Sequence, residues 1–209
     1  MTKNILVAFA VFMTLALASP AYSLAGAPTD TVKSAVDKVI TVLKDPSLKG
    51  PAREKDRRAK IRAAVFEVFD FEEMAKRSLA QNWRDRTPQQ KKEFVDLFRD
   101  LLERSYINRI ENYSDEKIIY DSEKSESDTA VVKSHFLTKR REEIPVEYRL
   151  LSENGKWMVY DLVIENVSLV NNYRVQFRKV ISSSSYDDLV KKMKNKEESE
   201  SFVSSSGTK

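Results

Sequence analysis

The sequence predicts an α+β domain in which helices come first, antiparallel strands follow, and helices return at the end. Three observations predict it. Apolar residues recur at helical spacing between Thr29 and Asn112. Short β-rich runs follow, two of them joined by Asn154-Gly155, a strong hairpin signal. Helical spacing then returns from Leu169. Because the chain has no internal repeat and no linker, we expect one domain with a sheet of about four strands.

The N-terminus has the composition of a secretory signal peptide, which we assign to residues 1–23. Lys3 supplies a positive charge, an apolar segment runs from Ile5 to Ala18, and small residues follow it. This segment is short for a membrane span, although an uncleaved anchor is the alternative. We expect cleavage after Ser23 or Ala25 and a folded domain over residues 24–194, located in the periplasm.

The composition restricts the available chemistry. The 209-residue chain has no cysteine, which excludes disulfides, thiol catalysis and Cys metal sites. Its one histidine, His135, lies in the middle of a predicted strand without a nucleophile-elbow glycine, and we interpret it as an ordinary strand residue. The sequence contains neither a zinc-binding HExxH motif nor a glycine-rich phosphate loop. We therefore expect no metal and no cofactor. A net charge of +4 is too mild to predict nucleic-acid binding.

Two helices are predicted before residue 70. The first starts at an N-cap formed by Thr29 or Asp30 and ends at Pro46. Gly50-Pro51 introduces the second, because proline is tolerated in the first turn of a helix.

Two more helices begin with capping-box patterns, in which a cap residue is followed three positions later by Glu or Gln. Asp70 and Glu73 form the first pair, and Thr87 and Gln90 form the second. The helix after Thr87 carries an apolar stripe at positions Phe94, Leu97, Phe98, Leu101, Ser105 and Tyr106.

Strands are predicted at residues 117–120, 129–138, 143–152 and 156–165. In the last strand, alternation places one apolar set on each face. The two sets are Trp157, Val159 and Val163 on one face, and Met158, Tyr160, Leu162 and Ile164 on the other. Asp161 falls on the first face and needs a partner if it is buried, and we propose Arg174. A sheet that is apolar on both faces either has helices on both sides or uses one face to line something else.

The end of the chain carries two shorter helical segments. Tyr173 and Phe177 belong to the first, and Ser185 caps the second. Residues 195–209 contain mainly Glu, Lys and Ser, with little to bury, and are predicted to be a disordered tail.

Two stretches carry a resemblance to a known family. DLVIENVSLVNNYRVQFRKVI, followed by YDDLVKKM, resembles the C-terminal signature of the MlaC, or toluene-tolerance, family. FDFEEMAKRSLAQNWRDRTPQQKKEFVDLFRDLLERSY is similar to the central helical block of that family. The resemblance runs from about Thr29 to about Lys194. It implies an NTF2-like fold in which a curved antiparallel sheet and helices enclose a deep apolar pocket.

The same resemblance implies a function. Members are soluble periplasmic carriers that hold phospholipid acyl chains in the pocket, with the head group near solvent, and they catalyse no reaction. They shuttle lipid between an outer-membrane lipoprotein–porin complex and an inner-membrane ABC transporter with an MCE-domain protein, and this system maintains outer-membrane lipid asymmetry. We accordingly expect phospholipid as cargo and a monomeric carrier.

We predict the pocket wall from the apolar positions of the long helix, the sheet and the segment that follows it. Any of these positions is equally suited to ordinary core, because core and wall look alike in sequence. The predicted wall comprises Phe94, Phe98, Leu101, Tyr106, Val132, Phe136, Val146, Tyr148, Trp157, Val159, Val163, Val167, Val170 and Tyr173.

Two alternatives to the carrier remain. The first is a non-catalytic adaptor whose apolar face binds a partner protein. The second is an NTF2-like isomerase, in which Asp161 would act as a base inside an apolar cavity.

Overall fold

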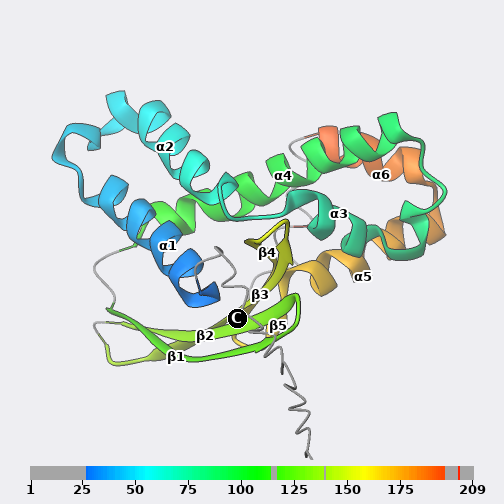
Figure 1. Cartoon of the computed structure of the whole chain (residues 1–209). Helices are drawn as coiled ribbons and strands as arrows, with labels where there is room; N and C mark the ends of the chain where they lie inside the picture. Colours follow the sequence, from blue (N-terminus) through cyan, green and yellow to red (C-terminus); the bar gives the residue numbers. More distant parts are fainter. Residues whose placement is uncertain (1–26, 114–116, 139, 196–201, 203–209) are drawn as a thin grey trace, which may run out of the picture.

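Helices form the first part and the end of the chain, and one antiparallel sheet lies between them in a computed structural model of the protein (Figure 1). The structure describes residues 27–113, 117–138, 140–195 and 202. The predicted signal peptide, residues 1–23, lies outside the described residues, as does the predicted tail apart from Asn195 and Phe202. No helix of the described part is both long enough and apolar enough to span a bilayer.

The α-helices and strands follow the predicted order. The helices are α1 (Pro28–Lys44), α2 (Glu54–Phe66), α3 (Phe71–Leu79), α4 (Pro88–Glu111), α5 (Leu169–Ser183) and α6 (Tyr186–Lys194). Short 3₁₀ turns lie at Pro46–Leu48, Pro51–Arg53 and Ala80–Trp83. The strands are β1 (Lys117–Glu126), β2 (Thr129–Leu137), β3 (Glu143–Glu153), β4 (Lys156–Ile164) and β5 (Val167–Ser168). The α+β class is confirmed, and the sheet has a fifth, two-residue strand that the sequence did not predict.

The predicted capping box is complete at the start of α4, whereas at α3 the Asp70 cap is present and the Glu73 carboxylate pairs with Lys76 and Arg77. The Asp70 carboxylate accepts a hydrogen bond from the Glu73 amide at 2.9 Å. At α4, Thr87 Oγ1 accepts from the Gln90 amide at 3.2 Å, and the Gln90 side chain accepts from the Thr87 amide at 3.0 Å. These bonds satisfy amides that would otherwise lack partners in the first turn, so the two helices begin where the sequence predicts.

The start of α1 differs from the prediction. Ala27 occupies the cap position without a side-chain bond, and Pro28 is the first helical residue. Thr29 instead donates two hydrogen bonds to the Glu123 carboxylate of β1, from its amide at 2.8 Å and from its hydroxyl at 2.6 Å. Proline supplies the helical φ at this position, which leaves Thr29 available to join α1 to the sheet.

The sheet is an antiparallel meander in the order β1-β2-β3-β4-β5. The predicted Asn154-Gly155 turn joins β3 to β4, with φ values of 51° and 75°. Glu165 and Asn166, at φ 49° and 66°, form the turn that returns the chain to pair with the end of β4 as β5.

A bulge in β4 changes the faces that alternation predicts. Leu150 pairs with Val159, whereas Arg149 pairs with Asp161, so Tyr160 is an extra residue. Directly paired residues share a face, and neighbouring residues of β3 face opposite ways. Val159 therefore shares the face of Leu150, and Asp161 lies on the opposite face.

The predicted apolar sets of β4 are therefore wrong beyond Val159. Tyr148 pairs with Leu162, which places Leu162 on the face of Leu150 and Val159. Val163, predicted to share a face with Val159, lies on the opposite face with Asp161. We call the face that carries Tyr148 and Leu150 the inner face, and the one that carries Arg149 and Asp161 the outer face.

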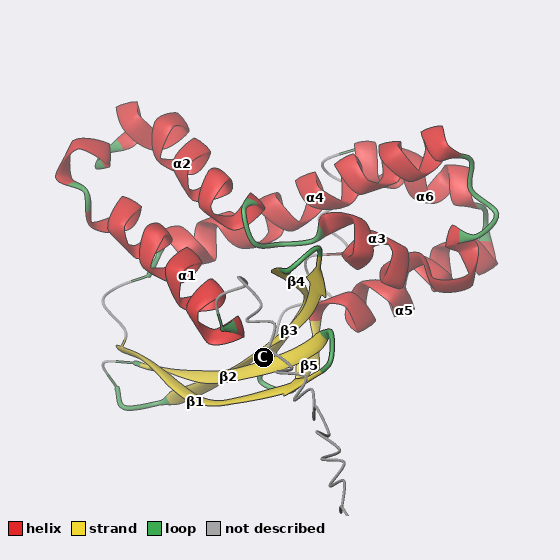
Figure 2. Cartoon of the chain, in the orientation of Figure 1, coloured by secondary structure: helices red, strands yellow, loops and turns green. Residues whose placement is uncertain are grey.

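Two apolar clusters stabilise the fold. The inner-face cluster joins the sheet to α1, and α1 lies along one side of the sheet (Figure 2). Its buried members are Val32, Ala130, Val132, Val146, Tyr148, Leu150 and Val159. The helical cluster joins α3, α4, α5 and α6, and Phe69 and Leu162 pack against both clusters. The segment before α3 also bonds the sheet, because the Val159 amide donates to the Val68 carbonyl at 2.7 Å.

The helical cluster includes one residue of the predicted tail. Phe202 is 4% exposed, and its ring centroid lies 5.6 Å from that of Phe177 in α5. This residue of the C-terminal segment therefore contributes apolar surface to the folded domain.

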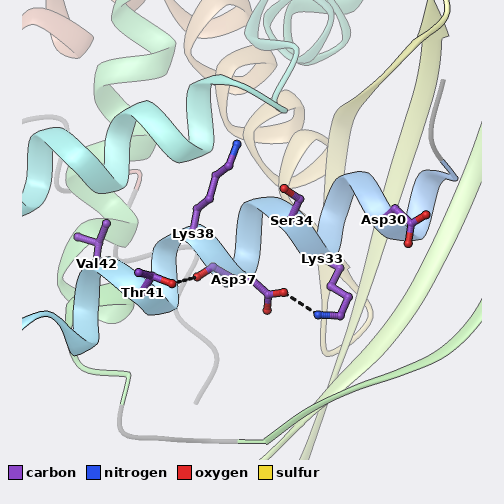
Figure 3. Close-up of a pocket in the computed structure, with 7 residues that line it drawn as sticks. All are labelled: Asp30, Lys33, Ser34, Asp37, Lys38, Thr41 and Val42. Carbon is purple, nitrogen blue, oxygen red and sulfur yellow. Dashed lines mark hydrogen bonds and ion pairs between the residues drawn. The ribbon is translucent and has the colours of Figure 1, made fainter. Parts of the chain in front are cut away.

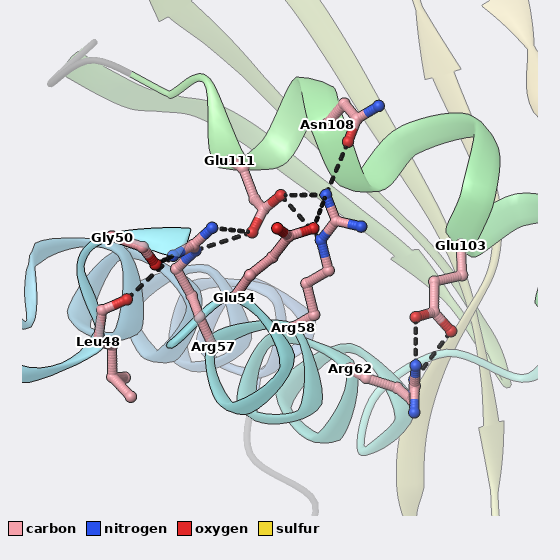
Figure 4. A network of polar contacts seen from close by, with 9 residues as sticks. All are labelled: Leu48, Gly50, Glu54, Arg57, Arg58, Arg62, Glu103, Asn108 and Glu111. Carbon is pink, nitrogen blue, oxygen red and sulfur yellow. Dashed lines mark hydrogen bonds and ion pairs between the residues drawn. The ribbon is translucent and has the colours of Figure 1, made fainter. Parts of the chain in front are cut away.

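A carboxylate of α4 holds α2 in place (Figure 4). Glu111, whose side chain is 11% exposed, accepts from Arg57 Nε at 2.7 Å and from Arg58 Nη2 at 2.8 Å. Burial alone would raise the pKa of Glu111, but hydrogen bonds from Arg58 and Arg57 outweigh it, and the pKa is lowered. Arg62 and Glu103 form a second link between the same helices.

We expect Glu111→Ala to loosen α2, because two partly buried guanidinium groups each lose the carboxylate acceptor that links them to α4. Hydrogen bonds to charged groups contribute about 1.5–3 kcal/mol, so hydrogen exchange of the α2 amides should accelerate by about tenfold or more. Because the pKa of Glu111 is lowered on folding, its contribution is present above the ordinary carboxyl range and is lost as the pH falls through the lowered value. Asp96→Ala is the control, since Asp96 pairs with Lys92 and Arg99 of its own helix. Equal protection of α2 in both variants would contradict this role.

Candidate functional site

The structure divides the predicted wall residues between the two clusters. Phe94, Phe98, Leu101, Val170 and Tyr173 are buried in the helical cluster, and Tyr106 packs against it. Val132, Val146, Tyr148 and Val159 are buried on the inner face, and Phe136 and Trp157 pack against them. The remaining two lie apart, because Val163 is buried on the outer face and Val167 is 46% exposed.

The helical part of the predicted wall has the packing of a core. Phe94, Phe98 and Tyr173 have no exposed surface. The ring centroids of Phe98 and Tyr173 lie 5.3 Å apart in an edge-to-face arrangement. The Tyr173 hydroxyl lies 3.2 Å from Ser105 Oγ, which gives the buried phenol a hydrogen-bond partner.

The inner face has half-buried apolar groups in addition to buried ones. Phe136, Trp157 and Ile164 come from β2 and β4, and Val36 comes from α1. These side chains are the apolar surface that a ligand between α1 and the sheet would contact. Ile164 and Val36 are absent from the predicted wall. Strict alternation placed Ile164 on the face opposite Val159, and the bulge in β4 reverses that assignment.

Three hydroxyl groups interrupt this apolar surface on adjacent strands. Tyr120 pairs with Ser134, and Tyr148 lies on the same face one strand further. The Tyr120 hydroxyl is buried without a hydrogen-bond partner. Ser134 Oγ is also buried, and the neighbouring Tyr148 hydroxyl is within its reach as a partner. Burial raises the pKa of Tyr148 to about 12, and burial also raises the pKa of Tyr120. Buried hydroxyls without partners cost about 1–3 kcal/mol each, and a ligand oxygen that accepts from them would recover that cost.

The sequence prediction missed Tyr120 and Ser134. The signal that could have found Ser134 is its spacing, two residues from both Val132 and Phe136. Tyr120 ends the first predicted strand, and only the pairing of β1 with β2 places it beside Ser134.

Asp161, the predicted partner of Arg174, has different partners. It is 3% exposed and accepts from Ser168 Oγ at 2.7 Å, the Val170 amide at 3.0 Å and Arg149 Nη1 at 3.3 Å. Arg174 donates to the side chain of Asn171 instead. The predicted pairing is therefore wrong, because the bulge turns Asp161 toward Arg149 and β5 brings the first turn of α5 to it. The carboxylate joins β4 to that turn.

His135 has the ordinary role predicted for it. Its Nδ1 lies 3.0 Å from an Asp121 carboxylate oxygen on the neighbouring strand. Within the described part of the chain, no three His, Asp or Glu side chains are grouped to hold a metal ion.

The described part of the structure includes two surface hollows of similar volume. The first, of about 620 Å³, is an open groove along α1 that includes Lys33, Asp37 and Lys38 (Figure 3). Lys33 Nζ lies 2.6 Å from an Asp37 carboxylate oxygen, so the charges there are largely paired. The second, of about 610 Å³, lies between α3, β4 and α5, and Val170 is the one predicted wall residue that lines it. Neither hollow is lined by inner-face residues.

These features define a class of α+β proteins in which a sheet turns an apolar face, with a few buried hydroxyls, toward its covering helices. The sequence model described as MlaC protein matches residues 33–195, and the chain belongs to the MlaC family.

Two known proteins are similar over most of their length. The intermembrane phospholipid transport system binding protein MlaC of Haemophilus influenzae is 23% identical over 171 residues, which are 79% of this chain and 80% of that protein. A solved structure of the phospholipid-binding protein of Ralstonia solanacearum, in complex with a phospholipid, superposes with a TM-score of 0.73. It is 27% identical, and the match covers 83% of this chain and 97% of that one.

Proposed function

We propose that this protein binds phospholipid and carries it between the outer and inner membranes as a soluble periplasmic component of a transport system. The observation that carries the proposal is the likeness to the Ralstonia solanacearum protein, whose structure was solved in complex with a phospholipid. The transport role is supported by the name of the Haemophilus influenzae relative. The partners we propose are an inner-membrane ABC transporter with an MCE-domain protein and an outer-membrane lipoprotein–porin complex, visited by a monomeric carrier.

We place the acyl chains against the inner face of the sheet, beneath α1. Phe136, Trp157 and Ile164 offer apolar side chains that are not fully covered by the protein itself. Tyr120 offers a buried hydroxyl donor without a partner, from which an ester or phosphate oxygen can accept, and Ser134 lies opposite it on β2. The helical residues of the predicted wall, including Phe98 and Leu101, then support the site as packed core.

The energetics of a lipid carrier suit such a surface. Each buried methylene contributes about 0.8 kcal/mol, so exposing two long acyl chains to water costs tens of kcal/mol. A carrier has to bury the chains nearly as well as a bilayer does, without binding them so tightly that release fails. Half-covered aromatic and aliphatic side chains meet both conditions, whereas a fixed charge at the same place does not.

The test is a matched pair of variants on neighbouring residues of β2. Phe136→Glu places a carboxylate on the inner face, and Leu137→Glu places one on the outer face. The two original side chains are both half-buried, so the variants are matched. We expect phospholipid, detected by mass spectrometry of an organic extract, to fall about tenfold or more in Phe136→Glu, because burying a charge beside acyl chains is costly. Leu137→Glu should carry as much lipid as the unchanged protein.

Circular dichroism establishes that both variants are folded. A folded Phe136→Glu protein that is fully loaded would contradict the placement of the lipid. An unchanged protein that stays empty after incubation with labelled phospholipid vesicles would contradict the carrier function and favour the adaptor alternative.

A further inference from the structure

The hollow between α3, β4 and α5 is rich in cationic side chains that the lipid site does not use. Lys76 and Arg77 come from α3, Arg84 follows the 3₁₀ turn after it, Arg149 comes from β3, and Arg174 comes from α5. We call this hollow, lined by these five residues, the basic cleft.

Three of the five cations are paired with carboxylates of the chain. Lys76 and Arg77 both pair with Glu73, at 2.8 Å each. Arg149 pairs with Glu147 at 2.8 Å and with Asp161 at 3.3 Å.

The two remaining cations lie at the exposed rim of the cleft. Arg174 bonds only the neutral side chain of Asn171, and Arg84 and Arg174 form no ion pair with any described carboxylate. Both side chains are exposed. The cleft therefore has an excess of positive charge located on two arginines, the cation that best binds carboxylates in two-point contacts.

The position of the cleft argues against a lipid head group as its occupant. Arg149 and Asp161 lie on the outer face, whereas the proposed lipid site lies on the inner face with Tyr148 and Leu150. A phospholipid whose chains lie beneath α1 would need its phosphate on the opposite side of the sheet. The buried carboxylate of Asp161, bonded to the first turn of α5, also disfavours a small anion deep in the cleft.

The surroundings of the two rim arginines resemble a protein interface. Trp83 and Tyr160 form part of the wall, and the Arg77 guanidinium carbon lies 4.1 Å from the Tyr160 ring centroid. Tryptophan, tyrosine and arginine are the residues enriched at the energetic centres of protein interfaces.

We propose that the basic cleft is a docking site for an acidic segment of a partner protein, held by Arg84 and Arg174. Electrostatic attraction from the rim would guide the partner to the cleft, and contact with the Trp83 and Tyr160 side chains would help to retain it. The proposal concerns a surface separate from the lipid site, and its case against a lipid head group rests on the proposed placement of the acyl chains.

The experiment is a nuclear magnetic resonance titration of the full chain with a synthetic peptide of alternating glutamate and leucine. We expect shifts concentrated at residues of the cleft. The double variant Arg84→Glu/Arg174→Glu should weaken binding about tenfold or more, and added salt should weaken binding to the unchanged protein. Lys55→Glu/Lys60→Glu on α2 makes the same change in net charge at exposed positions away from the cleft and should bind the peptide with nearly the affinity of the unchanged protein.

The remaining outcomes overturn the proposal. Shifts spread over all basic surfaces, or equal losses in both double variants, would show attraction to net charge alone. If inorganic phosphate shifts the resonances of the cleft residues and the peptide does not, the cleft is a binding site for a small anion. If phosphatidylglycerol vesicles bind the protein through Arg84 and Arg174 and the peptide does not bind, the cleft is a contact site for the membrane surface. Phospholipid content measured in each variant keeps this result separate from the carrier function, since loss of the docking site leaves the lipid content unchanged.

Discussion

Leu101→Asp is expected to prevent stable folding of this protein. Leu101 has no exposed surface and lies in the helical cluster that joins α3, α4, α5 and α6. The substitution removes most of a buried apolar side chain, which costs about 2–5 kcal/mol, and adds an unpaired carboxylate. The sum is comparable to the whole stability of a typical domain, about 5–15 kcal/mol.

The measurement is urea unfolding followed by circular dichroism, together with the phospholipid content of whatever protein is folded. Leu101→Met is the control, because swaps that conserve apolar volume cost less than about 1.5 kcal/mol. A Leu101→Asp protein that is folded but empty would mean that Leu101 lines the lipid site rather than the core. A protein that is folded and fully loaded would exclude both roles.

Local patterns predicted the helices well because the determining interactions are local. The Thr87 and Gln90 side chains satisfy each other's backbone amides within one turn, so the start of α4 can be recognised in the sequence. The start of α1 was placed two or three residues too late because Thr29, a good cap, bonds Glu123 on a distant strand. No local pattern contains that contact.

The faces of β4 were mispredicted for a related reason. Strict alternation is correct only while each residue opposes one partner, and the extra residue Tyr160 shifts every position after it to the other face. Nothing near Tyr160 in the sequence marks the bulge. The same shift places Asp161 on the face of Arg149. Asp161 therefore pairs with Arg149 and not, as predicted, with Arg174.

The candidate site was only partly predictable, because apolar core and ligand wall use the same residues. Phe98 and Phe136 occupy equivalent places in the sequence pattern, as apolar positions of a regular element. The structure separates them, since Phe98 has no exposed surface and Phe136 is half-buried. The unpaired hydroxyl of Tyr120, opposite Ser134 on β2, became visible only when the pairing of β1 with β2 was known.

Asp161→Ala is expected to destabilise the protein by about 2–3 kcal/mol, because a buried amide and a buried hydroxyl lose their acceptor. The lost contacts are those from the Val170 amide and from Ser168 Oγ, which attach the start of α5 to β4. The loss of the ion pair with Arg149 should add little, because that side chain is 38% exposed and also pairs with Glu147. Urea unfolding measures the change, and hydrogen exchange at Val170 reports the freed first turn of α5.

Two further variants identify the cause of that change. Asp161→Asn keeps an acceptor oxygen for the Val170 amide and should lose less stability than Asp161→Ala. Asp121→Ala removes an exposed carboxylate that pairs with His135 at 2.9 Å and should cost less than about 1 kcal/mol. If Asp161→Ala were as stable as the unchanged protein, the carboxylate would have no structural role, and a buried acid maintained without one would favour the isomerase alternative. If the loss is as large as we expect, the hydrogen bonds to Ser168 and Val170 are sufficient to explain why a carboxylate is buried at this position.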